Sequence, residues 1–239
     1  MQSAFISQHL ITDNIIIAYE LFHTLKRKNQ GRTGIMALKT DMSKAYDHIE
    51  WEYLRLIMLK MGFIEEWVSK LMRVVTTISY YFVRGSEEFG PLIPSRGLRQ
   101  GDPLSSYLFI IYMEGHSAIL STFEAQDRIH EVARGAIPVS HLCFTNDALF
   151  FSKAKEYEVS QLKNFLSLYE AASRQCINFS KSVVCFTPNT DSATRAQICQ
   201  SLGVQEVVNH GNCLGIPSVI GKEKRWIFQF IIEKAVKRL

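Results

Sequence analysis

The chain has 239 residues, of which 47% are hydrophobic and 21% charged, a balance that is typical of globular proteins and excludes a disordered or fibrous chain. The net charge is only +4, and it is concentrated near the C-terminus. The longest apolar runs, such as residues 107–113, are far shorter than the roughly 20 residues of a membrane span, and no charged and then apolar leader opens the chain; we therefore expect an intracellular protein of the cytoplasm or nucleus, neither secreted nor bound to membranes.

Apolar periodicity and turn residues divide the chain into helices and strands that do not alternate strictly, which favours an α+β fold over a doubly wound one. In the first third of the chain, the pattern predicts a helix over 11–28, a strand over 35–41, a helix over 49–62 with Ser43 as its candidate N-cap, and a helix over 64–78. A strand over 80–84 with a turn over 85–90 and a helix over 104–120 follow, and then strands over 139–144 and 148–151 that are joined by a hairpin turn. The last predicted elements are a helix over 156–173, a strand over 183–186, a helix over 192–202 and a basic helix over 222–239.

The predicted C-terminal helix carries six basic and two acidic residues, a difference of four that equals the net charge of the whole chain. A basic end on a near-neutral body suits contact with phosphate backbones, although a solvated helix face has the same pattern. The candidate nucleic-acid-binding residues are Lys222, Lys224, Arg225, Lys234, Lys237 and Arg238.

Two aspartates stand at the ends of predicted buried strands. Asp41 ends the run 35–41, and Asp147 follows Asn146 in the predicted hairpin turn. If these strands are neighbours, the two carboxylates converge at one sheet edge, where oxygen ligands suit Mg²⁺ and a pair of ions would serve an in-line displacement. An acid after a strand and an Asn-Asp hairpin turn are also ordinary local chemistry, so spacing alone leaves both interpretations open.

The loop over residues 96–105 combines two glycines with basic and amide side chains. Glycine allows the backbone to approach a ligand closely. Arg96 and Arg99 can reach phosphates, and Gln100 can hydrogen-bond a sugar or a base. A Gly-Pro loop that merely caps the following helix is the alternative.

Several motifs, in a consistent order, resemble the reverse transcriptase domain of LINE-type (non-LTR) retrotransposons, a kind abundant in plant genomes. The resemblance runs nearly end to end and implies an α+β palm, with partial fingers and palm over 1–212 and the start of a thumb over 213–239. The matching segments are 3–6 and 10–14 before the palm, 38–47 as the first catalytic motif, 97–105 as the template and substrate loop, 141–147 where the family has an aromatic residue, Ala, Asp and Asp, and 177–182 and 214–217 as later segments.

The resemblance implies an RNA-directed DNA polymerase with an RNA template, a DNA primer and dNTPs as partners and two Mg²⁺ ions as cofactors. Tyr46 would be a steric gate whose ring lies where a ribose 2′-OH would go, and the basic helix would grip the duplex backbone. Lys181 would stand near the triphosphate as a charge partner or proton donor. The implied catalytic residues are Asp41, Asn146, Asp147 and Lys181; the implied metal ligands are Asp41, Asp147 and the Met42 carbonyl; and the implied substrate-binding residues are Met42, Tyr46, Arg99, Gln100 and Gly101.

The departures from the family pattern are as informative as the matches. Asn146 replaces the first of two paired aspartates, and loss of that charge from a two-metal site would remove about 4 kcal/mol of transition-state stabilisation, roughly a 10³-fold rate loss. Arg174 stands where Gly is usual, Thr145 where Ala is usual, and Ser106 where Pro is usual. The chain also begins after the family's basic finger strands, so we expect a fragment that is catalytically impaired. A non-catalytic nucleic-acid-binding remnant and an inert product of a degenerate element are the alternatives.

Overall fold

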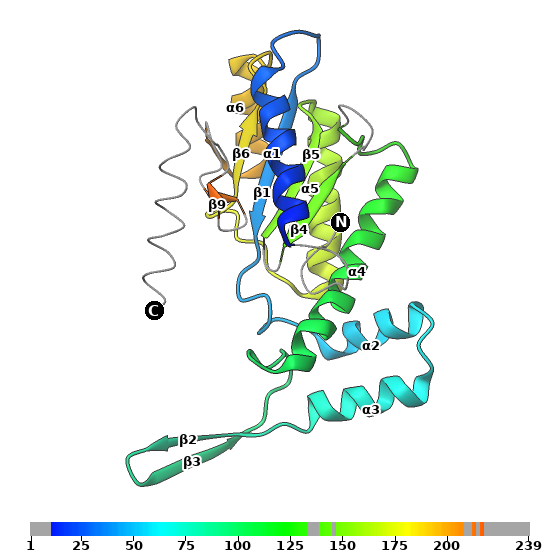
Figure 1. Ribbon diagram of the computed structural model, residues 1–239, viewed down its shortest axis with the longest axis vertical. Coiled ribbons are helices and arrows are strands. Elements are labelled where there is room, and N and C mark those ends of the chain that lie inside the picture. The colour runs from blue at the N-terminus through cyan, green and yellow to red at the C-terminus, as the bar shows by residue number, and fades with distance from the viewer. Residues whose placement is uncertain (1–10, 133–138, 145–146, 208–211, 214–215, 218–239) are drawn as a thin grey trace. The chain divides into compact units, whose positions relative to one another are not determined.

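A computed structural model describes residues 11–132, 139–144, 147–207, 212–213 and 216–217 (Figure 1). The chain divides into two compact units, the first of residues 1–40, 129–160 and 179–239 and the second of residues 41–128 and 161–178. No described helix is both long and apolar enough to cross a membrane. The described helices and strands are α1 (Ile11–Arg27), β1 (Ile35–Asp41), α2 (Trp51–Lys60), α3 (Glu65–Thr76), β2 (Tyr80–Arg84), β3 (Glu87–Leu92), α4 (Pro103–Ala125), β4 (His141–Phe144), β5 (Asp147–Lys153), α5 (Glu156–Ser173), β6 (Val183–Phe186), α6 (Ser192–Leu202), β7 (Gln205–Glu206), β8 (Asn212–Cys213) and β9 (Ile216–Pro217).

The first unit is built on a five-stranded sheet with the strand order β4-β5-β1-β6-β7. β4 pairs with β5 and β1 with β6 in antiparallel fashion, whereas β6 and β7 run parallel. The central strand β1 reads as a continuous apolar run, and the side chains of Met36, Ala37 and Leu38 are all 0% exposed. Such a run is typical of a strand that is covered on both faces. This observed mixture of helices and a mixed sheet confirms the predicted α+β class.

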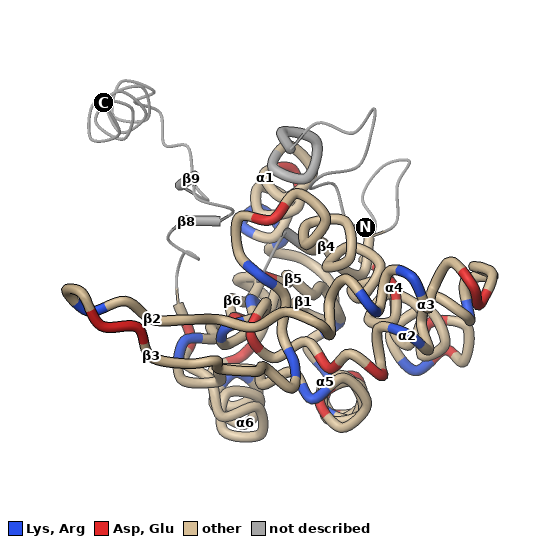
Figure 2. Tube along the Cα trace, turned by 90° about the horizontal axis from the view of Figure 1, so that it is seen from below, with Lys and Arg blue, Asp and Glu red and all other residues tan. Residues whose placement is uncertain are grey.

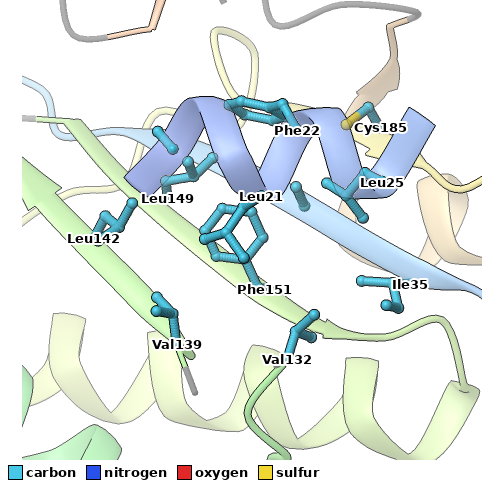
Figure 3. Packing of buried hydrophobic residues seen from close by; sticks show 12 residues of the cluster. Leu21, Phe22, Leu25, Ile35, Val132, Val139, Leu142, Leu149, Phe151 and Cys185 are labelled. Carbon is cyan, nitrogen blue, oxygen red and sulfur yellow. The ribbon is translucent and has the colours of Figure 1, made fainter. Parts of the chain in front are cut away.

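One face of this sheet is covered by α1, whose buried residues Ala18, Leu21, Phe22 and Leu25 follow helical spacing (Figure 3). The Phe22 ring lies 6.1 Å from the ring of Phe151 on β5, at an angle of 59°. Burial in this cluster also raises the pKa of the Cys185 thiol to about 12, because an apolar site disfavours the charged thiolate. The remaining members of the cluster are Ile35, Ala37, Val132, Val139, Leu142, Leu149, Phe151 and Cys185.

The second unit is mainly helical. α2 and α4 pack against each other around the rings of Tyr53 and Tyr112, whose centroids are 4.9 Å apart. The Tyr112 hydroxyl donates a hydrogen bond to the carbonyl of Ser173 at the end of α5. The β2–β3 hairpin is almost fully exposed and carries charge of both signs (Figure 2).

Most predicted boundaries in the described residues are confirmed to within two residues, but α4 extends to Ala125, five residues past its predicted end, and further details were wrong. Ser43 does not cap a helix, because residues 43–48 form turns and α2 begins only at Trp51, after Glu50. The segment predicted as a turn over 85–90 contains most of a second strand, β3, which pairs with β2. The basic helix over 222–239, and most of the predicted thumb over 213–239, lie outside the described residues.

Candidate functional site

Asp41, Met42 and Ser43 continue from the end of β1 and pair with residues 176–178. The Asn178 amide donates to the Asp41 carbonyl at 2.8 Å, and the Ser43 amide donates to the Cys176 carbonyl at 3.0 Å. Between these two bonds, Met42 lies opposite Ile177 in an antiparallel bridge. In such a pair, the central residue directs its own amide and carbonyl away from its partner. The Met42 carbonyl therefore accepts no hydrogen bond in this pairing. A carbonyl that serves as a metal ligand must be free of the pairing in this way.

Asp147 is the first residue of β5, opposite Phe144 of β4, and not part of the turn itself. Its carboxylate lies 3.1 Å from the Lys39 ammonium of the neighbouring strand β1, and both side chains are about four-fifths buried, with exposed fractions of 22% and 20%. Close by, the Thr40 hydroxyl donates to the Ala148 carbonyl at 3.3 Å. This ion pair was missed in the sequence, although Lys39 stands two residues before Asp41 inside the first catalytic motif.

The predicted convergence of Asp41, Asn146 and Asp147 remains a prediction, because Asn146 lies outside the described residues. Lys181 is exposed in the turn before β6. In the part of the chain that the structure describes, no group of three or more His, Cys, Asp or Glu side chains could hold a metal. The donor types nevertheless fit Mg²⁺, which prefers carboxylate and carbonyl oxygens and keeps several waters. Lys39 already offsets the charge of one of these carboxylates.

The predicted gate residue, Tyr46, and the loop over 96–101 are joined within the second unit. The Tyr46 ring stacks on the buried ring of Phe109 in α4, with centroids 4.7 Å apart and planes 7° from parallel. The Leu98 amide donates to the Tyr46 carbonyl at 2.9 Å, and the Gly97 amide donates to the Ile49 carbonyl at 2.8 Å. These contacts connect the segment over 46–49 directly to the loop over 96–101.

Trp51 at the start of α2 adds a third link. Its indole N–H donates to the Gly97 carbonyl at 2.8 Å. Gly97 has a φ of +91°, and a Cβ there would lie 3.0 Å from the Asp47 carbonyl oxygen. Glycine is required at this position both by the backbone conformation and by the close approach of residue 47.

A cavity of about 510 Å³ lies beside this loop, entirely within the second unit. Arg99 and Gln100, both predicted substrate-binding residues, line it, and so does Arg96. Gly101 is exposed and has open space around it. Among the described residues, the lining consists of Asp47, Trp51, Val74, Val75, Ile78, Tyr80, Pro94, Arg96, Gly97, Leu98, Arg99, Gln100, Asp102, Leu104, Ser105 and Leu108.

Two of the charged lining residues are already engaged. The Asp102 side chain caps α4 by accepting from the Leu104 amide at 2.8 Å, as an aspartate before a helical Pro is expected to do. Arg96 lies 3.7 Å from the Glu50 carboxylate. The sequence predicted this loop but not the cavity, because Val74, Ile78 and Tyr80 reach it from distant positions in the chain.

The chain matches the family model for the reverse transcriptase (RNA-dependent DNA polymerase) over residues 1–210. It therefore belongs to the reverse transcriptase family, and the resemblance stated from the motifs is confirmed at this level.

Two curated relatives carry the sequence similarity. The chain is 24% identical over 185 residues to an uncharacterised 149 kDa protein of transposon TX1 from Xenopus laevis, an alignment that covers 76% of this chain and 13% of that protein. It is 39% identical over 69 residues to an uncharacterised mitochondrial protein of Arabidopsis thaliana, which covers 28% of this chain and 56% of that protein. The chain thus spans only part of the length of both relatives.

Among solved structures, the chain is similar to telomerase from Candida albicans, which was determined in complex with the TWJ fragment of telomeric RNA. The TM-score is 0.54 at 12% sequence identity, and the match covers 77% of this chain and 31% of that one. A likeness at this level of identity shows a shared fold.

Proposed function

We propose that the chain is the reverse transcriptase domain of a non-LTR retrotransposon, with RNA-directed DNA polymerisation as its ancestral reaction. The similarity to a transposon protein over 76% of the chain supports the transposon lineage. The motif order supports the non-LTR class. An RNA template, a DNA primer and dNTPs are the partners that follow from this proposal, with partial fingers and palm over 1–212 and the start of a thumb over 213–239.

The observation that carries the polymerase proposal is the connection between Tyr46 and the loop over 96–101. A residue that excludes a ribose 2′-OH must be held rigidly, because discrimination by clash fails when the side chain can move aside. The stack on Phe109 restrains the Tyr46 ring, and the hydrogen bond from the Leu98 amide restrains the Tyr46 backbone. Arg99, Gln100 and Gly101 follow directly in the chain as candidate contacts to the incoming nucleotide and template.

In this proposal, Asp41, Asp147 and the Met42 carbonyl would hold Mg²⁺. When bound, the metal would supply charge stabilisation to the reacting phosphate and its oxygens. Lys181 would balance charge on the triphosphate and donate a proton to the leaving pyrophosphate. Tyr46 would select the sugar. The basic residues over 222–239 would bind the duplex backbone in a salt-sensitive manner.

We further propose that this chain is impaired in catalysis, because Asn146 replaces a carboxylate with a neutral amide. An amide oxygen cannot share a full negative charge between two cations. The second candidate function is a non-catalytic nucleic-acid-binding domain, and the substitution at 146 favours it. Metal binding separates the two candidates more sharply than polymerase activity alone.

The deciding experiment compares the Mg²⁺-dependent rise in melting temperature of the natural chain with that of Asn146→Asp. A ligand at ten times its Kd stabilises the folded state by about 1.4 kcal/mol, or about 3–6 °C for a chain of this length. We expect a rise of that order for the variant and a smaller one for the natural chain. Asn164→Asp, the same chemical change at an exposed position of α5, is the matched control.

Without metal, Asn146→Asp should melt slightly below the natural chain, because the added carboxylate repels its neighbours. Primer extension on an RNA template with Mg²⁺ or Mn²⁺ then reports whether chemistry returns with the ligand. Equal metal-dependent shifts in the natural chain, Asn146→Asp and Asn164→Asp would contradict the proposed metal site.

A further inference from the structure

The β2–β3 hairpin leaves a row of large apolar side chains in contact with solvent. Every residue of β3 is exposed, and so is every residue of β2 after Tyr80. In the described part of the chain, the two strands form a sheet of their own and pair only with each other. Each strand therefore has a free edge, which is a template for pairing with a further strand. The large apolar side chains of the hairpin that are 50–73% exposed are Tyr81, Phe82, Val83, Phe89 and Leu92.

The two free edges differ in how well they are protected. β3 contains Pro91 and two glutamates, and between Phe89 and Leu92 it has one residue more than β2 has between the positions that pair with them. Proline, charge and a bulge of this kind keep edge strands from pairing. Apart from Arg84 at its end, β2 consists of aromatic and β-branched residues, which favour strand pairing. The edge of β2 is therefore the one open to a further strand.

The turn of the hairpin determines which backbone groups of β2 face this edge. The turn over 85–86 begins with a glycine whose φ is +64°, as in the two-residue turns that close antiparallel hairpins. Such a turn closes on a hydrogen-bonded pair, here Arg84 with Glu87. Hydrogen-bonded and non-hydrogen-bonded pairs then alternate along the strands. The amide and carbonyl groups of Val83 and Tyr81 therefore point to the free edge.

We propose that this chain associates with a second copy of itself by antiparallel pairing of β2 with β2. When the twofold axis passes through Phe82, the whole strand overlaps its partner. The two Phe82 side chains are then opposite each other, and Tyr81 is opposite Val83 of the other copy. Aromatic pairs and aromatic–β-branched pairs of this kind stabilise antiparallel strands. The outward amide and carbonyl groups of Tyr81 and Val83 bond each other reciprocally, and the result is a closed, isologous dimer.

The charges of the hairpin favour a second copy over a nucleic acid. Arg84 is the only charged residue of β2, and the twofold axis places the two arginines at opposite ends, each beside the aromatic Tyr80 of the other copy. Like charges are therefore not opposed. The hairpin over 80–92 contains one arginine and two glutamates, and a segment with a net negative charge is repelled by phosphates.

The size of the interface sets the conditions of the test. Only one five-residue strand of each copy takes part, so we expect dissociation in the micromolar range. Sedimentation velocity of the full chain from about 1 to about 200 μM covers that range. We expect the mass to rise from 27.4 kDa toward twice that value.

A matched pair of proline variants tests the edge. Val83→Pro removes an amide that faces the partner without removing a bond between β2 and β3. It should weaken the dimer about ten-fold or more, because each copy loses a hydrogen bond of the interface. Glu88 is opposite Val83 in β3, so its amide points to the other edge of the hairpin. Glu88→Pro should leave the dimer unchanged.

A charge exchange at the twofold axis tests the register. Phe82→Lys and Phe82→Glu each place like charges opposite each other, so each variant alone should dimerise about ten-fold or more weakly than the natural chain. A mixture of the two should form a heterodimer, because an ammonium then faces a carboxylate. Variants that fail to fold cannot recover on mixing. Phe89→Lys and Phe89→Glu, at the opposing position of β3, are the controls and should dimerise like the natural chain.

A chain that stays monomeric at every concentration, or a dimer that is equally affected by Val83→Pro and Glu88→Pro, would overturn the proposal. A mixture of the two Phe82 variants that stays monomeric would overturn the register. If the chain is monomeric and Phe82→Glu instead weakens its binding to a single-stranded RNA, the hairpin contacts nucleic acid and the proposal is wrong. These measurements involve neither metal nor catalysis, so their outcome is independent of the Asn146→Asp test.

Discussion

Replacing Gly97 with alanine should disturb the substrate loop more than the same change at Gly101. Both glycines have similar positive φ angles, +91° and +87°. A Cβ at Gly97 would lie 3.0 Å from the Asp47 carbonyl oxygen and 3.3 Å from both the Asp47 Cα and the Tyr46 carbonyl oxygen, whereas a Cβ at Gly101 would meet nothing within 4 Å. The pair therefore separates backbone strain from steric conflict.

The strain contribution is shared by both variants. A left-handed conformation costs an L-residue about 1–2 kcal/mol, and alanine regains part of this by restricting the unfolded chain. Gly101→Ala should thus lower the free energy of unfolding by about 1 kcal/mol. In Gly97→Ala the backbone at residue 97 must also move away from the Asp47 carbonyl. This movement strains the hydrogen bonds donated by the Leu98 and Gly97 amides and by the Trp51 indole. Loss of one such bond adds about 1 kcal/mol, so the total is about 2–3 kcal/mol.

Thermal unfolding followed by tryptophan fluorescence measures the difference. For a chain of this length, 1 kcal/mol corresponds to about 2–4 °C, so Gly101→Ala should melt about 2–4 °C lower and Gly97→Ala at least twice as far below the natural chain. Both positions belong to one compact unit, so the same transition reports both. Equal shifts would refute the reasoning, because they would mean that the Asp47 carbonyl does not approach residue 97.

Two further predictions concern charge and helix termination. Burial lowers the pKa of His141 to about 3, below its ordinary value near 6.5. Below pH 6.5 the unfolded chain therefore binds a proton at this histidine that the folded chain does not bind, and the free energy of unfolding should fall by up to about 1.4 kcal/mol per pH unit from pH 6.5 toward 3. In melting experiments at several pH values, His141→Gln should reduce this loss of stability at acid pH. The control His23→Gln, at an exposed position, should not reduce it. Arg174 has a φ of +58° just after α5, so Arg174→Gly should stabilise the chain by about 0.5–1 kcal/mol. Ala172→Gly inside the helix should destabilise it by a similar amount. Denaturant titration measures both changes, and stability changes of the same sign would contradict this prediction.

The elements that the sequence predicted most accurately are those whose ends are marked locally. The strand over 35–41 and the helices over 156–173 and 192–202 have the predicted bounds. In α6, Asp191 accepts from the Thr194 amide and Gly203 takes the left-handed C-cap conformation. Such caps are written in a few adjacent residues. Sequence periodicity therefore sufficed where a cap or a buried run was present.

The errors arose where distant contacts decide the structure. In the helix predicted over 49–62, Leu54 and Met58 are fully buried, whereas the equally apolar residues Leu56 and Met61 are about half exposed. The strand β3 contains two glutamates, a glycine and a proline, which are poor strand formers. It forms because β2 pairs with it, and an exposed hairpin carries no hydrophobic alternation to reveal that pairing.

In the candidate site too, features within one segment were predicted from the sequence, and features that depend on distant contacts were not. Motif resemblance identified Tyr46 and the loop with Arg99 and Gln100, because their order along the chain is distinctive. It did not identify Phe109 as the ring behind Tyr46, or the cavity beside the loop. These features depend on which side chains meet across α2, α3 and α4, and no spacing rule within one segment encodes such meetings.

The ion pair of Lys39 with Asp147 gives the proposed metal ligand a positively charged partner. With asparagine at 146, the Asp147 carboxylate is balanced one to one by an ammonium 3.1 Å away. In the proposed metal site, a carboxylate at 146 would add a second negative charge next to Asp147 in the chain, and repulsion between like charges favours uptake of a cation. Asn146→Asp is therefore expected to strengthen metal binding. The core cluster around Phe22 and Phe151 includes neither Lys39 nor Asp147.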